Sequence, residues 1–192
     1  MSQTVPAPLD FLLTRRSRPA KMLTTPVPDR AALEVLLTAA ARVPDHGKLE
    51  PWRFIVLEKP ALDRLADLAR ARGTAMGMEP ERIDKGVAQY AEADLVVAVI
   101  AAPIQSDKIP QIEQTLSAGA VCLGLVNAAL AAGWGACWLT GWAAHDREFA
   151  AQGLGLASQE YVAGMIHIGT SARTPPDRPR PEIARITTWQ TD

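Results

Sequence analysis

A cluster of hydrogen-bond donors near the start of the chain is the first candidate for chemistry. Residues 15–18 read RRSR. They lie at the end of a short amphipathic helix that begins near Leu9 and stops at Pro19. Arginine forks match phosphate oxygens and a serine hydroxyl adds a donor, so the cluster could bind an anion. It could equally be a solvated helix end, and the residue types alone leave both interpretations open.

A second polar segment lies between an expected helix and an expected strand. Residues 43–51 read VPDHGKLEP, which is dense in turn formers. Loops in this position often carry binding or catalytic residues. His46 is the titratable residue of interest here, although a single loop histidine is more often only solvated.

Several other kinds of site are not supported. There is no G-x-S-x-G elbow for a serine nucleophile, and His167 lies inside an apolar segment. Neither a P-loop nor a G-x-G-x-x-G that opens a helix after a strand is present. The two cysteines, Cys122 and Cys137, lack the neighbours that a metal site needs and are too few for a disulfide framework. We expect two buried thiols in a cytoplasmic protein.

Length and charge limit the function further. The chain has 192 residues and we expect one domain over residues 1–192, with residues 1–8 as a flexible tail. Twenty basic and twenty-one acidic residues give a formal charge of -1, which offers no case for binding nucleic acid or an anionic membrane. The two arginines at 15 and 16 are not followed by an apolar segment, so no export signal is indicated.

The elements that must position these residues are organised around residues 114–144, which contain no charged side chain. Residues 114–132 have apolar side chains at helical spacing on every side, so this helix must be surrounded. Gly133 is the expected cap, and residues 133–141 are expected to form a turn that enters a short strand. A bilayer, a domain core or a core together with a subunit interface could bury the helix. Alanine and glycine content and the absence of flanking Lys/Arg clusters argue against the bilayer.

Three apolar segments predict core strands, at residues 52–57, 93–102 and 161–168. Helices are expected from residue 28 to before Pro44 and from Pro60 to Gly73, and residues 74–92 are expected to be a mobile helix or lid. Alternating helices and apolar strands indicate an α/β or α+β fold with both faces of the sheet covered. The proline-rich residues 174–181 begin a C-terminal arm, residues 174–192, that could pack on a partner subunit.

In combination, these motifs resemble those of one enzyme family. RRS at residues 15–17, ARVPDHGKLEPWRF at 41–54, SAG at 117–119 and GWGACWLTG at 133–141 occur in an order and spacing that is similar to the nitroreductase family of flavoproteins. The resemblance is closest to its small, single-domain NAD(P)H nitroreductase branch. It extends from about residue 9 to about residue 169.

The resemblance implies an α+β, three-layer fold with a central mixed sheet flanked by helices, in a homodimer with FMN at the interface. NADH or NADPH would be the electron donor, and FMN would carry the chemistry without a catalytic side chain. The residues implied for FMN are Arg15, Arg16, Ser17, Arg42, His46, Trp138, Leu139 and Thr140. Those implied for NAD(P)H are Ala128, Ala129, Leu130, Ala131, Ala132 and Gly133.

The implied activity is ping-pong reduction of nitroaromatics, quinones or similar electron-poor acceptors. A flavin-binding or storage protein, or an enzyme with another reductive chemistry such as dehalogenation or flavin fragmentation, is the alternative. The chain departs from the family pattern where many members carry Asn, because Lys48 stands there, and Glu50 takes the place of Gln before Pro-Trp. Leu139-Thr140 is less polar than some relatives' Arg-Ser, and Arg178 or Arg180 of the arm could restore the lost cation.

Overall fold

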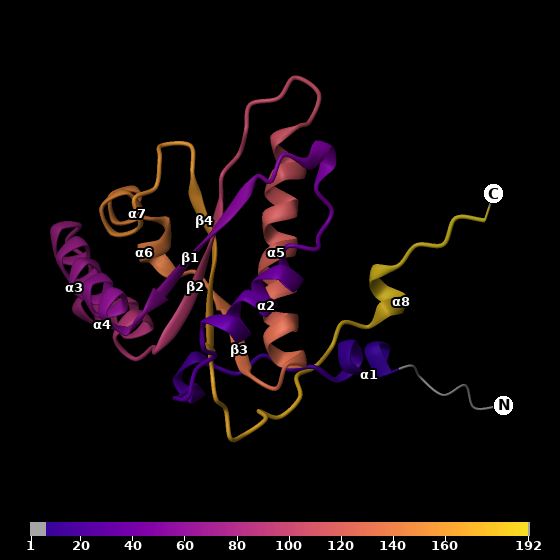
Figure 1. Ribbon diagram of the computed structural model, residues 1–192, viewed down its shortest axis with the longest axis horizontal. Coiled ribbons are helices and arrows are strands. Elements are labelled where there is room, and N and C mark those ends of the chain that lie inside the picture. The colour runs from indigo at the N-terminus through magenta and orange to yellow at the C-terminus, as the bar shows by residue number, and fades with distance from the viewer. Residues whose placement is uncertain (1–6, 192) are drawn as a thin grey trace.

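The computed structural model describes residues 7–191, and a four-stranded sheet runs through the middle of it (Figure 1). The strands are β1 (Trp52–Glu58), β2 (Leu95–Ala101), β3 (Gly135–Leu139) and β4 (Tyr161–Gly169), in the spatial order β1-β2-β4-β3. Each neighbouring pair is antiparallel. The expected mixed sheet is therefore wrong for the described residues, because helices separate the strands in sequence without forming any parallel crossover.

Helices cover both faces of the sheet, so the expected α+β, three-layer architecture is confirmed. Helices α3 (Lys59–Ala75), α4 (Pro80–Ala91), α6 (Gly141–His145) and α7 (Arg147–Leu154) lie on one face. Helices α2 (Arg30–Ala40) and α5 (Gln111–Ala131) lie on the other (Figure 1). All seven residues of β2 are buried, as a central strand between two helical layers requires.

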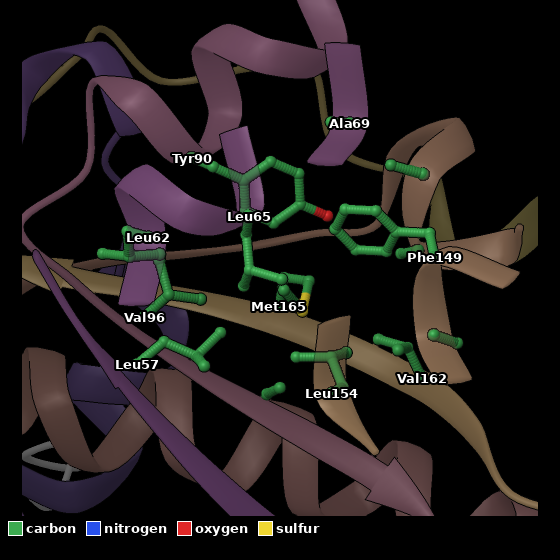
Figure 2. Packing of buried hydrophobic residues seen from close by; sticks show 14 of the residues in the cluster. Leu57, Leu62, Leu65, Ala69, Tyr90, Val96, Phe149, Leu154, Val162 and Met165 are labelled. Carbon is green, nitrogen blue, oxygen red and sulfur yellow. The ribbon is translucent and has the colours of Figure 1, made fainter. Parts of the chain in front are cut away.

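The core under α3 and α4 corrects one expectation. Residues 74–92 are not a lid, because α4 buries Ile83, Val87 and Tyr90 against α3 and the sheet. Figure 2 shows Tyr90 beside Phe149 of α7, and the two ring centroids are 5.3 Å apart. Apolar residues at spacings of three and four mark α4 as an amphipathic helix with a core face.

The second core lies under α5, the longest helix. Its buried residues are Gln114, Ser117, Ala118, Val121, Cys122, Leu125, Val126 and Ala129. Gly124 brings α5 close to α2, since an added Cβ there would lie 3.2 Å from the carbonyl oxygen of Ala40. Gly133, just past the end of the helix, forms the expected glycine cap. Its φ is +86°, and the N–H of the next residue, Trp134, donates to the carbonyl oxygen of Ala129.

One side of α5 stays open. Ile112, Leu116 and Leu123 are 61%, 65% and 46% exposed, and they follow one another at helical spacing. By length and composition alone α5 could cross a membrane, but its other side is part of the core, which is how a core helix behaves. An apolar side of this kind on a helix that also carries core residues indicates a surface for another protein.

Both ends of the described chain are also apolar and exposed. Helix α1 (Ala7–Thr14) has no buried residue, and neither has the one-turn helix α8 (Ile183–Ile186) of the arm. Trp189, beyond α8, is 85% exposed. The tail expected over residues 1–8 lies outside the described residues up to residue 6, and residues 7 and 8 already belong to α1.

A buried histidine makes stability depend on pH. Burial lowers the pKa of His167, in β4, from 6.5 to about 4. In the unfolded chain the ring takes up a proton below about 6.5, while in the folded protein it stays neutral to about pH 4. Stability from this group is therefore complete above pH 6.5 and is lost as the pH falls.

We predict that His167 lowers the free energy of unfolding by about 2 kcal/mol between pH 7 and pH 5. His167→Gln should lose that part of the pH dependence, whereas His145→Gln, at an exposed position of α6, should retain it. Urea titrations of the three proteins at both pH values measure the difference. Equal pH dependence in the wild type and His167→Gln would contradict the assignment.

Candidate functional site

The arginine cluster follows α1 and is attached to the end of the sheet. Arg15 continues the helical pattern, because its backbone N–H donates to the carbonyl oxygen of Phe11 at 2.8 Å. The N–H of Arg18 then donates to the carbonyl oxygen of Ala136 in β3, also at 2.8 Å. These two bonds place the segment across the end of β3, beside the C-terminal end of α5.

Arg15 contacts α5 and its own segment. Its Nη1 donates to Asn127 Oδ1 at 3.3 Å and its Nη2 donates to Ser17 Oγ at 3.2 Å. Both acceptors are neutral, so neither compensates the charge. Burial, and after it the positive charges of Arg180 and Arg16, lower the pKa of Arg15. The guanidinium therefore lies in an environment that disfavours its charge until an anion is present.

Arg16 and Arg18 hold the start of the C-terminal arm. Arg16 Nη2 donates to the carbonyl oxygen of Pro176 at 2.9 Å, and Arg18 Nη2 donates to Thr174 Oγ1 at 3.0 Å. Asp177 lies 3.6 Å from Arg16 Nε, which is an ion-pair distance but too long for a hydrogen bond. The arm is thus fixed to the cluster at its base and leaves the body beyond it.

Two donors in this cluster have no acceptor. The Nε atoms of Arg15 and Arg16 are buried and make no hydrogen bond within residues 7–191. A buried N–H of a charged group without an acceptor is costly, and such groups usually mark a ligand. A cavity of about 350 Å³ lies beside them, with Arg18, Leu130 and Gly133 in its lining. The arrangement fits a phosphate group or another anion of that size.

The strand end that follows the cluster carries an exposed tryptophan. Trp138 in β3 is 41% exposed and its Nε1 donates to the carbonyl oxygen of Ala163 at 3.2 Å. The ring lies against Gly164, where an added Cβ would be 2.3 Å from Nε1. Leu139 and Thr140 follow, half-buried, before α6 begins. Trp138 therefore offers a partly exposed apolar ring on β3, an edge strand of the sheet.

The segment implied for NAD(P)H is divided by the structure. Ala129 is fully buried in the core under α5, so its side chain is not available to a ligand. Leu130 and Gly133 line the cavity beside the arginines, and residues 131 and 132 are exposed at the helix end. Only the last turn of the segment is therefore open to a ligand, together with Ala128, which is half-buried.

The polar loop is held at the other end of α5. Ser117 Oγ donates to the carbonyl oxygen of Pro44 at 2.7 Å and accepts from Trp52 Nε1 at 3.1 Å. Asp45 accepts from the backbone N–H groups of Leu49 and Glu50, at 3.1 and 2.9 Å. These bonds connect the loop to α5 and β1 and close it into a compact turn.

Two predicted residues belong to this region, Arg42 just before the loop and His46 within it, and they behave differently. His46 Nδ1 lies 2.7 Å from Glu113 Oε2, in the first turn of α5. Arg42 is exposed just after α2, and its side chain makes no hydrogen bond or ion pair with residues 7–191. Both therefore face away from the core of the described subunit.

The structure does not bring all the predicted FMN residues together in one subunit. His46 is attached to α5 at Glu113, whereas Arg15 is attached at Asn127. Fourteen residues of one helix separate these attachment points, which is about 21 Å along its axis. Arg15, Arg16 and Ser17 form one group, whereas His46 lies toward the opposite end of α5 and Arg42 contacts neither.

Three residues that contact these groups, Asn127, Glu113 and Thr174, were not predicted as site residues. Asn127 is an amide in a long apolar helix, and Glu113 is the last charge before the uncharged run. Each breaks the pattern of its surroundings, which is the signal that could have identified it. Thr174, which accepts from Arg18, has no such signal, because its position depends on how the arm turns back.

Comparison with known proteins identifies the family. The family model described as "Nitroreductase family" matches residues 12–170. The chain belongs to the nitroreductase family. The Escherichia coli K12 protein named "Putative NAD(P)H nitroreductase YdjA" is 32% identical over 162 residues, which are 84% of this chain and 87% of that protein. A Haemophilus influenzae protein named "Putative NAD(P)H nitroreductase" is 36% identical over 164 residues, with the same coverage.

Solved nitroreductase structures share the fold. The crystal structure of the Bacteroides fragilis nitroreductase with bound FMN superposes with a TM-score of 0.74 and 19% sequence identity, over 97% of this chain and all of that one. At this identity the similarity shows the fold, and the residue assignments for this nitroreductase-family chain depend on its own geometry.

Proposed function

We propose that this chain is an FMN-dependent NAD(P)H oxidoreductase that reduces electron-poor acceptors such as nitroaromatics and quinones by a ping-pong mechanism. The two buried Nε donors of Arg15 and Arg16, which lack an acceptor beside a 350 Å³ cavity, are the observation that carries the proposal. The phosphate of FMN would supply the missing acceptors and charge. The FMN bound by a structural neighbour supports the same cofactor, and the names of the relatives support NAD(P)H as the donor.

Each group of residues has a task in this scheme. Arg15 and Arg16 would bind the phosphate, with Ser17 and Asn127 orienting Arg15 through its Nη atoms. Trp138 and the half-buried Leu139 and Thr140 would form an apolar bed for the ring system. FMN, when bound, supplies the group that accepts hydride from NADH or NADPH and delivers it to the acceptor.

Residues of this chain would also determine where the donor and the acceptor bind in the two half-reactions. Nicotinamide and acceptor would use one open space in turn, with the exposed end of α5 near Gly133 holding the dinucleotide. Cationic side chains near the ring would stabilise negative charge that develops during reduction. We place the protein in the cytoplasm, where NADH and NADPH are available and where two free buried cysteines remain reduced.

A homodimer would complete the site. Glu113 and Asn127 lie seven residues before and after Ala120 on α5. A twofold axis that crosses the open side of α5 near Ala120 pairs two antiparallel copies of the helix. It sets the end that carries His46 in one subunit opposite the end that carries Arg15 in the other. The His46 end and the Arg15 end, 21 Å apart along α5 in one subunit, would then lie within about the width of a helix pair of each other across the interface.

The surface of the subunit is suited to that pairing. Ile112, Leu116 and Leu123 form an apolar stripe around the proposed axis, with Gly119 and Ala120 at its centre. An added Cβ at Gly119 would meet nothing within 4 Å, so this small residue leaves room for a close helix neighbour. Exposed apolar residues on α1 and on the arm would add to an interface that is large and hydrophobic, as obligate dimers have.

The function is tested by the spectrum of the purified protein. It should be yellow or take up FMN, and NADH or NADPH should bleach it without oxygen. Adding a quinone or nitroaromatic should restore the colour with turnover. Bleaching without acceptor turnover would instead support the binding or storage alternative, and a protein that takes up no FMN would contradict the proposal.

Arg16→Ala should weaken FMN binding at least tenfold, because charge-assisted hydrogen bonds contribute about 1.5–3 kcal/mol each. Arg30→Ala is the matched control, since Arg30 is an exposed arginine of α2 paired only with Glu34. Fluorescence titration of each apoprotein with FMN gives the dissociation constants of the wild type and the two variants. Equal constants for Arg16→Ala and the wild type would show that the cluster does not bind the phosphate.

Leu116→Asp combined with Leu123→Asp should convert the dimer to monomers, because two charges would be buried without partners in the paired helices. Val35→Asp is the control, since Val35 is 67% exposed on α2 and lies outside the stripe. Light scattering during size-exclusion chromatography measures the mass of each protein. A wild type that is monomeric at micromolar concentration would refute the pairing.

A further inference from the structure

We propose that His46 is the catalytic proton donor to the acceptor and that Glu113 is the positioning residue that orients it. The inference rests on the proposed function, because it concerns the oxidative half-reaction at the same site. It adds a side chain to chemistry that the resemblance assigns to the cofactor alone.

The contact between the two side chains determines which nitrogen is free. His46 Nδ1 lies 2.7 Å from Glu113 Oε2. A carboxylate only accepts hydrogen bonds, so Nδ1 carries a hydrogen and donates it. The other ring nitrogen, Nε2, then makes no hydrogen bond within residues 7–191 and is open to exchange a proton. Glu113 lies in the first turn of α5, where the helix dipole favours its negative charge.

Stability does not account for this pair. Its side chains are 63% and 45% exposed, and pairs of that exposure contribute little to stability because water screens them. The loop nevertheless holds His46 firmly through Asp45 and Ser117. It also contains Lys48 and Glu50 at positive φ values of 55° and 48°, which cost free energy for residues with side chains. Strain and fixation of this kind occur where a side chain must be presented to a ligand.

The proposed dimer gives that side chain its target. His46 stands at the Glu113 end of α5, which the twofold pairing would set beside the FMN held by the partner subunit's Arg15 group. Of the side chains proposed around the flavin, the arginines do not release protons in proteins, whereas a histidine ring nitrogen is able to release one and take it up again. His46 is therefore suited to a proton transfer that the arginines are unable to make.

The step balances with a quinone as acceptor. FMN, when bound and reduced, would supply both electrons and one hydrogen to the acceptor. The protonated His46 ring releases its Nε2 proton to the quinone carbonyl oxygen, and the product is the hydroquinone. The neutral ring is then reprotonated by water, while Nδ1 keeps its hydrogen bond to Glu113. Such a donor typically contributes a factor of about 10² or more.

The kinetic test compares two acceptors. A quinone needs a proton in the step, whereas ferricyanide accepts only electrons, so the ratio of their turnover rates isolates proton delivery. His46→Gln should lower the quinone-to-ferricyanide ratio at least about tenfold. Glu113→Gln should lower it less, and Glu113→Asp should recover part of it. His145→Gln and Glu81→Gln, both at exposed positions away from the loop, should keep the wild-type ratio.

A second readout does not depend on turnover. Nitrogen NMR of the neutral histidine ring reports which nitrogen carries the hydrogen, and His46→Gln assigns the signal. The wild type should show it on Nδ1, and Glu113→Ala should move it to Nε2. An unchanged ratio in FMN-loaded His46→Gln, or a wild-type hydrogen on Nε2, would overturn the proposal while NADH bleaching still supports the function. A protein that takes up no FMN would overturn both.

Discussion

The burial of α5 is the constraint on which the rest of the structure depends. A helix of 21 residues with a single acidic residue in its first turn and no other charge must be covered on nearly every side. The sheet and α2 cover one side through Val121, Leu125 and Val126. The remaining stripe is apolar, continuous and open, so a folded subunit leaves its longest helix half-covered. Pairing with a second copy, as proposed above, would satisfy the same requirement that folding satisfies on the inner side.

This constraint also explains where polar groups occur along the helix. Ser117 and Gln114 are buried but fully used, since Ser117 fixes Pro44 and Gln114 bonds both backbone groups of Ile104. Asn127 and Glu113 lie instead toward the open side, and each orients a residue of the candidate site. A polar atom on an apolar helix is costly unless it has a partner. The helix therefore carries polar groups where they attach the loops of the site.

The strands and the central helix could be predicted from the sequence, because buried strands and an all-round apolar helix have strong hydrophobic patterns. Sheet order and direction could not, since the pairing of β2 with β4 depends on contacts between residues 60 to 71 positions apart. The mobile helix or lid predicted for residues 74–92 is wrong because the charges in this segment obscure the apolar face of α4, which buries Tyr90. Neighbouring charges say little about the opposite face of an amphipathic helix.

The candidate site shows the same division. Its residue types were identifiable, because arginines beside a serine suit a phosphate whatever the fold. Their arrangement was not, since Arg15 and His46 belong together only if two subunits meet. The spacing of 31 residues between them carries no sign of the 21 Å that α5 imposes. A residue-by-residue comparison with a family names both residues without saying that one subunit holds them apart.

The loop that carries His46 shows what holds a backbone where the residue type does not favour it. φ at Lys48 is 55°, a left-handed conformation that asparagine tolerates better than lysine does. Asp45 and Ser117 impose the turn through hydrogen bonds from both sides. These hydrogen bonds, and not the type of residue 48, therefore fix the path of the loop, and with it the position of His46 beside the first turn of α5.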